Sequence, residues 1–431
     1  MSVTRALYSL LVLLALPVLS LVVGWRSLRE RHYAQGWAAR FGLGAPLAGS
    51  ARSIWLHAVS VGEVQAAAPL LAALRAQYPE VPLTISSATP AGRERARALA
   101  GPGIDVRYAP YDLGLCVRGS LRRLRPKLLL IIETELWPNL LAACATAGVP
   151  VIIASARLSE RSCRRLVKFP GLLQPALRTA ITVAAQSAAD AQRFAALGVP
   201  AAQLHVCGNI KFDRTPGESL RAAGTSLRSR FAAARLLWVA GSTHEGEEQA
   251  VLDAHQALRA SGAVRCAEAL LVLAPRHRPR FDAVAQLLNE RGLPWLRYSE
   301  ASAAGAAPAG AAVLLLDTIG DLESFYAAAD LAFVGGSLVP VGGHSLLEPA
   351  ALGVPSICGP HMHAAPQVAR DLAASGATWI VESPAQLGAA VLELAADESR
   401  RRAMSAAALA VVAANRGALE RVLQQVRAKL A

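Results

Sequence analysis

Short apolar runs rich in Val, Ile and Leu alternate with Ala- and Leu-rich segments of helical period, and this alternation constrains the fold more than any other feature of the chain. Strands buried on both faces have continuous apolar sequences, and helical crossovers join parallel strands. The pattern therefore predicts parallel βαβ units, with the strands SIWLHAV, VPLTISSA, LLLIIE, VPVIIASA and TAITVAAQ before about residue 187 and LLWVAGS, ALLVLAP, AVLLLDT, LAFVGGS and PSICGP after it.

The two series of strands indicate two Rossmann-like, doubly wound α/β domains in tandem. Such domains bind ligands at the carboxyl ends of their strands, so we expect the two to face a common cleft. A chain of 431 residues is also too long for one ordinary core. We place an N-terminal domain at 33–212 and a C-terminal domain at 213–431, with a polar linker at about 213–232 and a last helix able to pack back on the N-terminal domain.

Residues 1–32 predict a membrane anchor with a basic flank. Residues 6–25 carry no charge, and about 20 apolar residues are enough to span a bilayer. No small-residue cleavage site precedes the next arginines, which disfavours a secretory signal peptide. Arg26, Arg29 and Arg31 against the single Arg5 place the body of the protein on the cytoplasmic side. The sequence leaves open whether the helix spans the bilayer or lies at its interface.

The formal net charge of +13 is carried almost entirely by arginine. It suits nucleic acid, an anionic membrane face or a phosphorylated substrate. Nucleic acid is disfavoured because the chain has neither aromatic stacking platforms nor a recognisable recognition module. The six scattered cysteines lack the spacing of a zinc site or a disulfide framework, so reduced, mostly buried thiols in a cytosolic compartment are expected.

Carboxylates follow two predicted strands of the N-terminal domain. Glu63 lies just before an Ala/Leu-rich helix, where it either complements the helix dipole or acts as a general base. Glu133 and Glu135 come at the end of an apolar strand, and two carboxylates at that place are costly unless they have partners. Their position favours a functional role.

Glycine and basic residues follow the strands of the C-terminal domain. Gly241 and Ser242 lie between a strand and a helix, where backbone N–H groups bind anions. Arg276 and His277 belong to a basic turn that either binds phosphate or carboxylate or is simply solvated. No D-x-D pair occurs in the sequence, which disfavours a metal-bridged diphosphate and favours neutralisation by Arg and helix N-termini.

The segment GGHSLLEP allows two interpretations. Ser345 and Glu348 match a capping box, which is a purely structural role. Pro349 argues against that register, because it would occupy a helical position where an N–H is required. A helix that begins at Pro349 instead leaves Glu348 at its mouth, free to bind a ligand hydroxyl, beside a glycine pair, Gly342 and Gly343, that permits close backbone approach.

Taken together, HAVSVGE, ETELWPN, ARLSERS, GNIKFD, APRHRPRF and GGHSLLEPAALGVPSICGPH resemble the motifs of the 3-deoxy-D-manno-octulosonic acid (Kdo) transferases of lipopolysaccharide assembly. The resemblance covers almost the whole chain, in the family's order. It implies a GT-B glycosyltransferase fold, CMP-Kdo as donor and a lipid A precursor (lipid IVA) as acceptor. It also implies an inner-membrane location with cytoplasmic catalytic domains, and inversion at the anomeric carbon without metal or cofactor.

The resemblance also implies roles for individual positions. Glu63 matches the base that deprotonates the acceptor hydroxyl, and Glu133 matches a second essential carboxylate. Ser345 and Ser155 stand where the family usually has Asn, and a hydroxyl makes fewer hydrogen bonds than an amide. The expected donor-binding positions are Arg276, His277, Gly241, Ser242, Gly335, Gly336, Gly342, Gly343, Ser345 and Glu348, and the possible acceptor or cleft positions are Ser60, Gly62, Glu135, Arg157 and Lys211.

Two alternatives stay open: a GT-B glycosyltransferase of another family with a different nucleotide sugar, and a non-catalytic, membrane-anchored nucleotide-binding protein. The segment RLSERSCRRLVKFPGLL places Arg161, Arg164 and Arg165 beside apolar residues. We expect it to lie on the membrane or to contact acceptor phosphates, and a solvated helix face is the alternative. The motifs do not determine how many Kdo residues are transferred.

Overall fold

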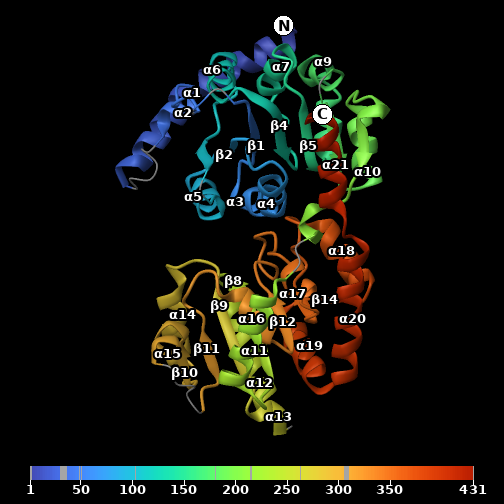
Figure 1. Cartoon of the computed structure of the whole chain (residues 1–431). Helices are drawn as coiled ribbons and strands as arrows, with labels where there is room; N and C mark the ends of the chain where they lie inside the picture. Colours follow the sequence, from blue (N-terminus) through green and yellow to red (C-terminus); the bar gives the residue numbers. More distant parts are fainter. Residues whose placement is uncertain are drawn as a thin grey trace. The chain divides into compact units, whose positions relative to one another are not determined.

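The computed structural model describes residues 2–29, 36–47, 49, 51–101, 103–179, 181–213, 216–262, 264–304 and 310–430. Contacts divide the chain into two compact units. Unit 1 comprises Met1–Asp213 and Asn415–Ala431, and unit 2 comprises Arg214–Ala414. Each unit is built on its own seven-stranded parallel sheet with helices on both faces (Figure 1), which confirms the predicted doubly wound α/β class.

The sheet of unit 1 has the strand order β3-β2-β1-β4-β5-β6-β7. The chain builds outward from β1 to β3, returns to the centre and continues from β4 to β7 on the other side. The order therefore reverses between β1 and β4. The strands are β1 Ser53–His57, β2 Leu83–Ser87, β3 Ile104–Tyr108, β4 Pro126–Ile132, β5 Val151–Ala156, β6 Ile181–Ala185 and β7 Leu204–Val206.

Both faces of this sheet are apolar, as expected for a sheet covered on both sides. In β1, Ile54 and Leu56 point into one core cluster, and Trp55 points into the other. The helical and 3₁₀ segments of unit 1 are α1 Val3–Arg29, α2 Trp37–Arg40, α3 Val61–Ala66, α4 Ala68–Gln77, α5 Pro90–Leu99, α6 Gly114–Leu124, α7 Pro138–Thr146, α8 Glu160–Leu166, α9 Pro170–Leu177, α10 Ala188–Ala196, η2 Ala201–Gln203, η3 Ile210–Asp213 and α21 Ala418–Leu430.

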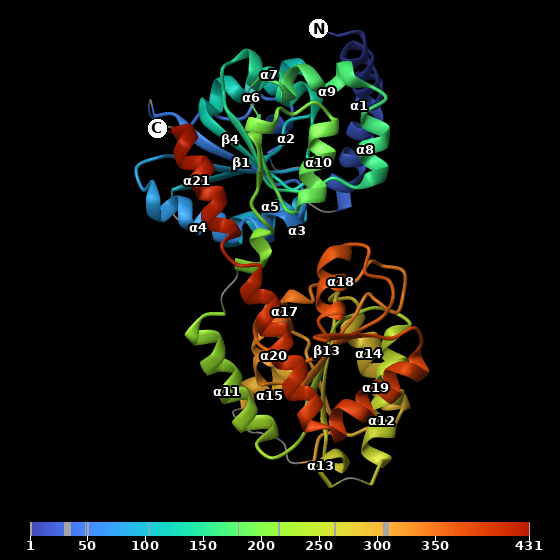
Figure 2. The same ribbon diagram turned by 90° about the vertical axis from the view of Figure 1, so that its right-hand side faces the viewer.

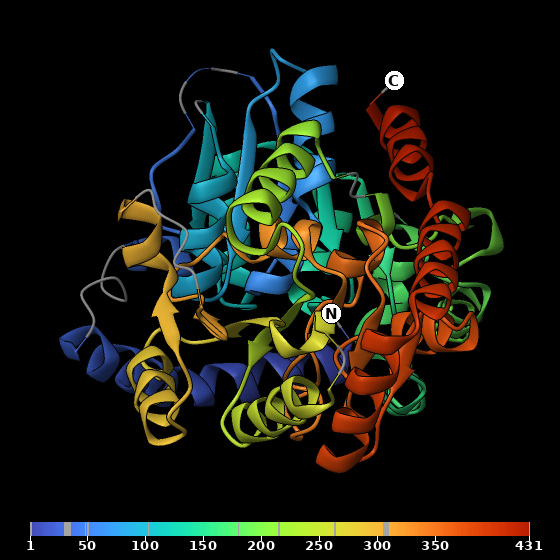
Figure 3. The same cartoon turned by 90° about the horizontal axis from the view of Figure 1, so that it is seen from below.

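The last helix, α21, packs on unit 1 beside α4 (Figure 2), and the chain ends at its far end (Figure 3). Val422 and Val426 are fully buried in the core on that face of the sheet. The carboxylate of Asp213 accepts hydrogen bonds from the backbone N–H groups of Gly417 and Leu419, both at 2.6 Å. The Asp213 carboxylate thus links the start of α21 to η3, the element of unit 1 that ends at Asp213.

The sheet of unit 2 has the order β10-β11-β9-β8-β12-β13-β14, so its order reverses between β8 and β12. The strands are β8 Leu237–Thr243, β9 Leu270–Pro275, β10 Trp295–Arg297, β11 Val313–Leu315, β12 Leu331–Val334, β13 Ser356–Cys358 and β14 Thr378–Ile380. The helices are α11 Glu218–Ala232, α12 Glu247–Ala260, α13 Val264–Ala267, α14 Arg280–Glu290, α15 Tyr298–Ala304, α16 Leu322–Ala328, α17 Leu347–Ala351, α18 Pro366–Ala374, α19 Pro384–Ala396 and α20 Glu398–Ala414.

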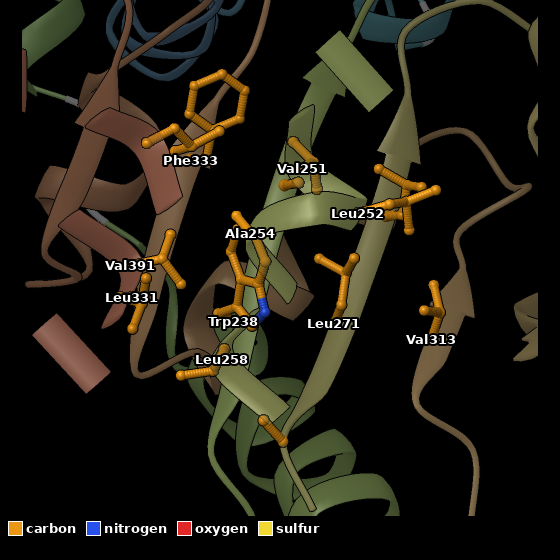
Figure 4. Close-up of a cluster of buried hydrophobic side chains, with 14 of the residues drawn as sticks. Trp238, Val251, Leu252, Ala254, Leu258, Leu271, Val313, Leu331, Phe333 and Val391 are labelled. Carbon is orange, nitrogen blue, oxygen red and sulfur yellow. The ribbon is translucent and has the colours of Figure 1, made fainter. Parts of the chain in front are cut away.

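The core of unit 2 is centred on Trp238, which the close-up in Figure 4 shows among aliphatic side chains of neighbouring strands and of α12. Its indole N–H donates to Nδ1 of buried His255, at 3.1 Å. Nδ1 is therefore the acceptor, and His255 Nε2 carries the proton that is donated to the Ala312 carbonyl at 2.9 Å. Burial lowers the pKa of His255 to about 3, so the ring packs as a neutral group.

The structure corrects the prediction of a linker over 213–232. Residues 218–232 form α11, which packs against α16 through buried Leu227 and Phe231. A Cβ at Gly224 would lie 2.5 Å from the Cβ of Ala327, so the glycine lets the two helices approach closely. The segment has a polar sequence because only one face of α11 is covered.

The N-terminal segment forms α1, which packs along α7 and α9. The hydroxyl of Ser9 and the side-chain amide of Asn139 exchange hydrogen bonds at 3.0–3.2 Å, and the Ser2 hydroxyl donates to the Gly171 carbonyl. In the part of the chain that the structure describes, no helix is long and apolar enough to cross a membrane. The predicted anchor is therefore not confirmed. The side chains of its basic flank, Arg26, Arg29 and Arg31, lie outside the part of the chain that the structure describes.

Candidate functional site

Each sheet offers one place where ligands of doubly wound folds bind, beside the reversal of strand order. The predicted carboxylates of unit 1 follow β1 and β4, the two strands at its reversal. Of the predicted glycines of unit 2, Gly241 lies near the end of β8 and the others follow β12, and these are the two strands at its reversal. The topology thus brings the sequence-predicted residues of each unit to a single edge of its sheet.

Glu63 lies in the first turn of α3, the helix that follows β1, and exchanges hydrogen bonds with the N-cap residue Ser60 in the manner of a capping box. The backbone N–H of Glu63 donates to the Ser60 hydroxyl at 3.3 Å, and that hydroxyl donates to Glu63 Oε1 at 2.9 Å. The backbone N–H of Val59 donates to Oε2 at 2.8 Å. The side chain is thereby held at the strand end, next to the exposed Gly62.

The pKa of Glu63 is raised from its usual value to about 7, mainly because the carboxylate is desolvated by burial. The hydrogen bonds from Val59 and Ser60 act in the opposite direction, and the negative charges of Glu135 and Glu133 add to the rise. A carboxylate with a pKa near 7 accepts a proton readily and is still about half ionised at pH 7. The structural and functional interpretations of Glu63 are therefore compatible.

Glu133 directly follows β4 and has a left-handed conformation, with φ of 64°. This conformation costs a residue with a Cβ about 1 kcal/mol or more, and such strain gathers at functional sites. The Glu133 carboxylate pairs with the Lys211 ammonium at 2.6 Å. Its backbone carbonyl accepts from the N–H of Arg157 at 3.4 Å. Lys211 thus supplies the partner that the Glu133 carboxylate requires at a buried strand end.

Glu135 lies beside Glu133 and accepts a hydrogen bond from the Trp137 indole at 2.6 Å. Its pKa is raised, chiefly by burial and also by the charge of Glu133. The indole of Trp137 meets His57, at the end of β1, edge to face at 4.6 Å. Sequence analysis missed His57, although it stands in the HAVSVGE motif. The buried His57 ring packs against the Trp137 indole and so helps to position the indole that donates to Glu135.

Ser155, where the related family usually has Asn, is also left-handed, with φ of 54°. Its hydroxyl accepts from the N–H of Ile210 at 3.3 Å and donates to the Asn209 side chain at 3.4 Å. The Asn209 side chain in turn accepts from the N–H of Lys211 at 3.0 Å. Ser155 therefore positions the loop that carries Lys211, with weaker hydrogen bonds than an amide provides.

The structure corrects the placement of Gly241 and Ser242. Both belong to β8, where the pairing with β9 shifts between Gly241 and Thr243, and Ser242 has φ of 57°. A Cβ at Gly241 would lie 2.0 Å from the Tyr326 hydroxyl, so the glycine is required by packing. The helix begins only at Glu247, which separates the two residues from its N-terminus.

The two glycine pairs of the β12 loop are held against neighbouring loops. The N–H groups of Gly342 and Gly343 donate to the Gly336 carbonyl at 3.1 and 2.7 Å, and that of Gly335 donates to the Gly241 carbonyl at 2.8 Å. Gly336, Gly342 and Gly343 have φ of 67°, 120° and 76°. Glycine is therefore needed here for backbone conformation and close loop packing.

A histidine pair lies over Gly336. The Nε2 atoms of His244 and His344 are 2.8 Å apart, so one ring donates and the other accepts. Burial and the neighbouring charges of Arg276, His244 and His277 lower the pKa of His344 to about 4. Arg276 and His277 themselves are exposed, and the Arg276 N–H donates to the Thr243 carbonyl at 2.9 Å. The side chains of Arg276 and His277 are thus exposed at the same edge of the sheet, where they can donate hydrogen bonds.

Neither predicted register of GGHSLLEP is correct. α17 begins at Leu347, with Leu346 as N-cap, and the exposed Ser345 makes no capping hydrogen bond. Pro349 is then the third helical residue, whose N–H would have no partner within the helix anyway, so proline is tolerated. Glu348 lies in the first turn and is half-buried, close enough to raise the pKa of the buried Tyr326 after the larger effect of burial.

Comparison with known proteins agrees with these motifs. Residues 35–214 match the family described as 3-Deoxy-D-manno-octulosonic-acid transferase (kdotransferase). The chain is 36% identical over 425 residues to the 3-deoxy-D-manno-octulosonic acid transferase of Haemophilus influenzae, which covers 98% of each chain. It is 38% identical over 413 residues to that of Bordetella pertussis, which covers 93% of this chain and 94% of the relative.

Solved structures with low sequence identity share the fold. MurG of Acinetobacter baumannii is 14% identical, with a TM-score of 0.53 over 88% of this chain and 99% of its own. UDP-GlcNAc 2-epimerase from Neisseria meningitidis, bound to UDP-GlcNAc, is 12% identical, with a TM-score of 0.57 over 87% of this chain and 99% of its own. These likenesses concern the fold alone and confirm the predicted GT-B class.

Gly335→Ala is expected to destabilise unit 2. The new Cβ would lie 2.6 Å from the Ser242 carbonyl oxygen and 2.7 Å from the Thr243 Cα, both of them backbone atoms. Overpacking of this kind costs about 1–3 kcal/mol, and urea denaturation measures it. Gly388→Ala in α19 is the matched control, because its Cβ would meet only the Ala254 Cα at 4.0 Å. A Gly335→Ala protein as stable as this control would contradict the packing described.

Proposed function

Because this chain belongs to the 3-deoxy-D-manno-octulosonic acid (Kdo) transferases, we propose that it transfers Kdo from CMP-Kdo to a sugar hydroxyl of a lipid A precursor. The proposed reaction inverts the anomeric carbon, needs no metal or cofactor, and belongs to inner-core assembly of lipopolysaccharide at the inner membrane. The observation that carries the proposal is Glu63, a carboxylate of raised pKa held at the strand-order reversal of unit 1.

Glu63 acts as the general base in this proposal. As the acceptor oxygen attacks the anomeric carbon of Kdo, its proton passes to a Glu63 carboxylate oxygen, and the bond from that carbon to the CMP phosphate breaks. The phosphate leaves with the bonding electrons as CMP. Attack from the face opposite the leaving group inverts the configuration. The hydrogen bonds of Val59 and Ser60 orient the Glu63 carboxylate without neutralising it.

Glu133 and Lys211 serve the acceptor side in this proposal. Their ion pair at 2.6 Å fixes the Glu133 carboxylate, whose charge also helps to raise the pKa of Glu63. Oriented carboxylate oxygens accept hydrogen bonds from sugar hydroxyls, which holds the acceptor while the base acts. Ser60, Gly62 and Glu135 follow the same two strands, Arg157 follows the neighbouring β5, and in this proposal they complete the acceptor surface.

The donor binds in this proposal at the loops that follow β8, β9 and β12. Arg276 supplies a rigid fork for the CMP phosphate or the Kdo carboxylate, and His277 stands beside it. Glu348, half-buried in the first turn of α17, accepts hydrogen bonds from the ribose diol. Competition by CMP but not by UDP separates this donor from that of a UDP-sugar glycosyltransferase.

The outer surfaces of α1 and α8 suit an anionic membrane face. The inner face of α1 contacts α7 and α9, whereas its outer face exposes the aliphatic side chains of Val3, Leu7, Leu10, Leu11, Leu13, Leu14, Val18 and Leu21. Arg161, Arg164 and Arg165 are exposed on α8, and exposed Val167 and Phe169 follow it. A helix with one apolar face and cationic neighbours lies in the membrane interface, where it places the active unit beside a lipid acceptor.

Glu63→Gln is expected to lower kcat by about 10²–10⁴-fold, because the amide cannot accept the proton. The KM for CMP-Kdo should change little, since the donor is bound by other loops. Release of CMP and formation of the Kdo-linked product measure the rate. Glu94→Gln, at an exposed position of α5, is the control and should retain the wild-type rate.

The pH dependence separates a base from a merely structural Glu63. Only the ionised carboxylate accepts a proton, so kcat/KM of the wild type should rise with pH through about 7 and fall about tenfold per pH unit below it. The residual activity of Glu63→Gln should lose this dependence. Full turnover in the variant would contradict the proposed base, and so would a wild-type profile that is flat from pH 5 to about 8.

Reversing Arg161, Arg164 and Arg165 to Glu is expected to weaken binding to phosphatidylglycerol vesicles at least about tenfold, because each basic side chain near an anionic surface contributes about 1 kcal/mol. Turnover on vesicle-embedded acceptor should fall in parallel. Reversal of exposed Arg75, Arg97 and Arg402, which lie on other helices, is the charge-matched control. Unchanged vesicle binding and activity in the α8 variant would exclude this membrane surface.

A further inference from the structure

Glu247, the first residue of α12, has four backbone hydrogen-bond partners and no exposed surface. Its Oε2 accepts from the N–H groups of His244 at 2.9 Å and Gly336 at 2.7 Å. Its Oε1 accepts from the N–H groups of Ser337 and Leu338, both at 2.9 Å. One carboxylate therefore joins the loop after β8 to the turn after β12, the two strands at the reversal of order in unit 2.

The turn at 335–338 presents three consecutive N–H groups toward one point, a geometry that attracts an anion. Here the chain supplies that anion itself, as Glu247. Backbone N–H groups left without an acceptor in a buried place cost about 1–3 kcal/mol each. The turn therefore keeps this conformation because the Glu247 carboxylate accepts hydrogen bonds from all three N–H groups.

The same turn is held closely on its other sides. Ser337, also fully buried, accepts from the Gly359 N–H through its hydroxyl at 2.8 Å, and its carbonyl accepts from the His361 N–H at 3.0 Å. A Cβ on Gly336 would come within 3.0–3.4 Å of the rings of His344 and His244. The position of the turn thus decides whether these two rings meet at their 2.8 Å contact.

We propose that Glu247 is a positioning residue for the donor site. By binding the N–H groups of both loops, it fixes the turn at 335–338, keeps His244 against His344, and holds open the surface that receives the nucleotide. Glu247 touches no substrate, because it is enclosed by the backbone that it orders. This inference rests on the proposed function, since it assumes that the loops after β8 and β12 bind the donor.

Glu247→Gln keeps the shape of the side chain but turns an amide NH₂ toward two backbone donors. We expect the Kd of CMP, measured by calorimetry, to rise at least about tenfold. The KM for CMP-Kdo should rise by a similar factor, with a smaller change in kcat, because the base in unit 1 is untouched. Glu247→Asp retains the charge but withdraws it by one methylene, so it should show an intermediate loss and serves if the glutamine variant folds poorly.

Asp330→Asn is the matched control. Asp330 is another carboxylate of unit 2 that accepts from a backbone N–H, that of Leu237 at 2.8 Å, and it also pairs with Arg228 at 2.7 Å. Asp330 lies before β12, at the end of this strand opposite to the turn at 335–338. Loss of its carboxylate should therefore lower Tm without changing the Kd of CMP. An equal loss of CMP affinity in Asp330→Asn would show general destabilisation and overturn the inference.

Wild-type affinity for CMP in both Glu247 variants would also overturn it. A wild-type protein that binds no CMP would instead contradict the proposed function, and the two failures are thereby distinguished. An unchanged KM with a reduced kcat would likewise exclude a role in positioning the donor.

Discussion

The strand order reverses beside β1 in unit 1 and beside β8 in unit 2, and these two points determine where the proposed active groups lie. At these two points successive crossovers leave in opposite directions, so the carboxyl ends of the central strands are not covered by a connecting helix. In unit 1, residues 54–56 of β1 and 128–132 of β4 are apolar and buried. Chemistry-bearing side chains begin within a few residues of these ends. The residues of the core therefore lie within the strands, and the proposed active groups lie in the segments that follow them.

Hydrogen bonds from backbone N–H groups have different consequences for Glu63 and Glu247, because the two carboxylates are buried to different extents. Glu63 and Glu247 both accept hydrogen bonds from backbone N–H groups next to a helix start. Glu63 stays partly exposed and has a raised pKa, because desolvation outweighs its few hydrogen bonds. Glu247 is enclosed and bound on both oxygens by four donors, which leaves it no capacity for a substrate. Burial therefore separates the group proposed for proton transfer from the group proposed to hold a loop.

The sequence predicted the interior of the fold better than its edges. All ten predicted strands are present, because a strand buried on both faces has an uninterrupted apolar sequence. The four strands that were missed, β3, β7, β10 and β14, are the outermost strands of the two sheets. Edge strands are short and partly solvated, and β3 carries Asp105 and Arg107 among its apolar residues. Such strands lack a periodic signal.

Local helix registers and buried polar contacts were also beyond sequence reasoning. The polar sequence of α11 predicts a linker because the covered face of this helix is narrow, and α17 begins between the two registers that GGHSLLEP predicts. The pairing of Glu133 with Lys211 and the roles of His57 and Glu247 depend on contacts between segments far apart in the chain. Two adjacent acids of STHEGEE, Glu247 and Glu248, do offer one sequence signal, since they precede the apolar residues of a helix. The structure shows that both are buried.

The anomeric configuration of the product tests the proposed reaction most directly. Wild-type protein would be incubated with CMP-Kdo and a tetra-acylated lipid A precursor, in the presence of a chelator, and the new linkage examined by NMR. We expect release of CMP and a Kdo glycoside of inverted configuration, formed at an undiminished rate in the presence of the chelator. Retained configuration, or transfer that stops when divalent cations are removed, would contradict a metal-independent displacement assisted by Glu63.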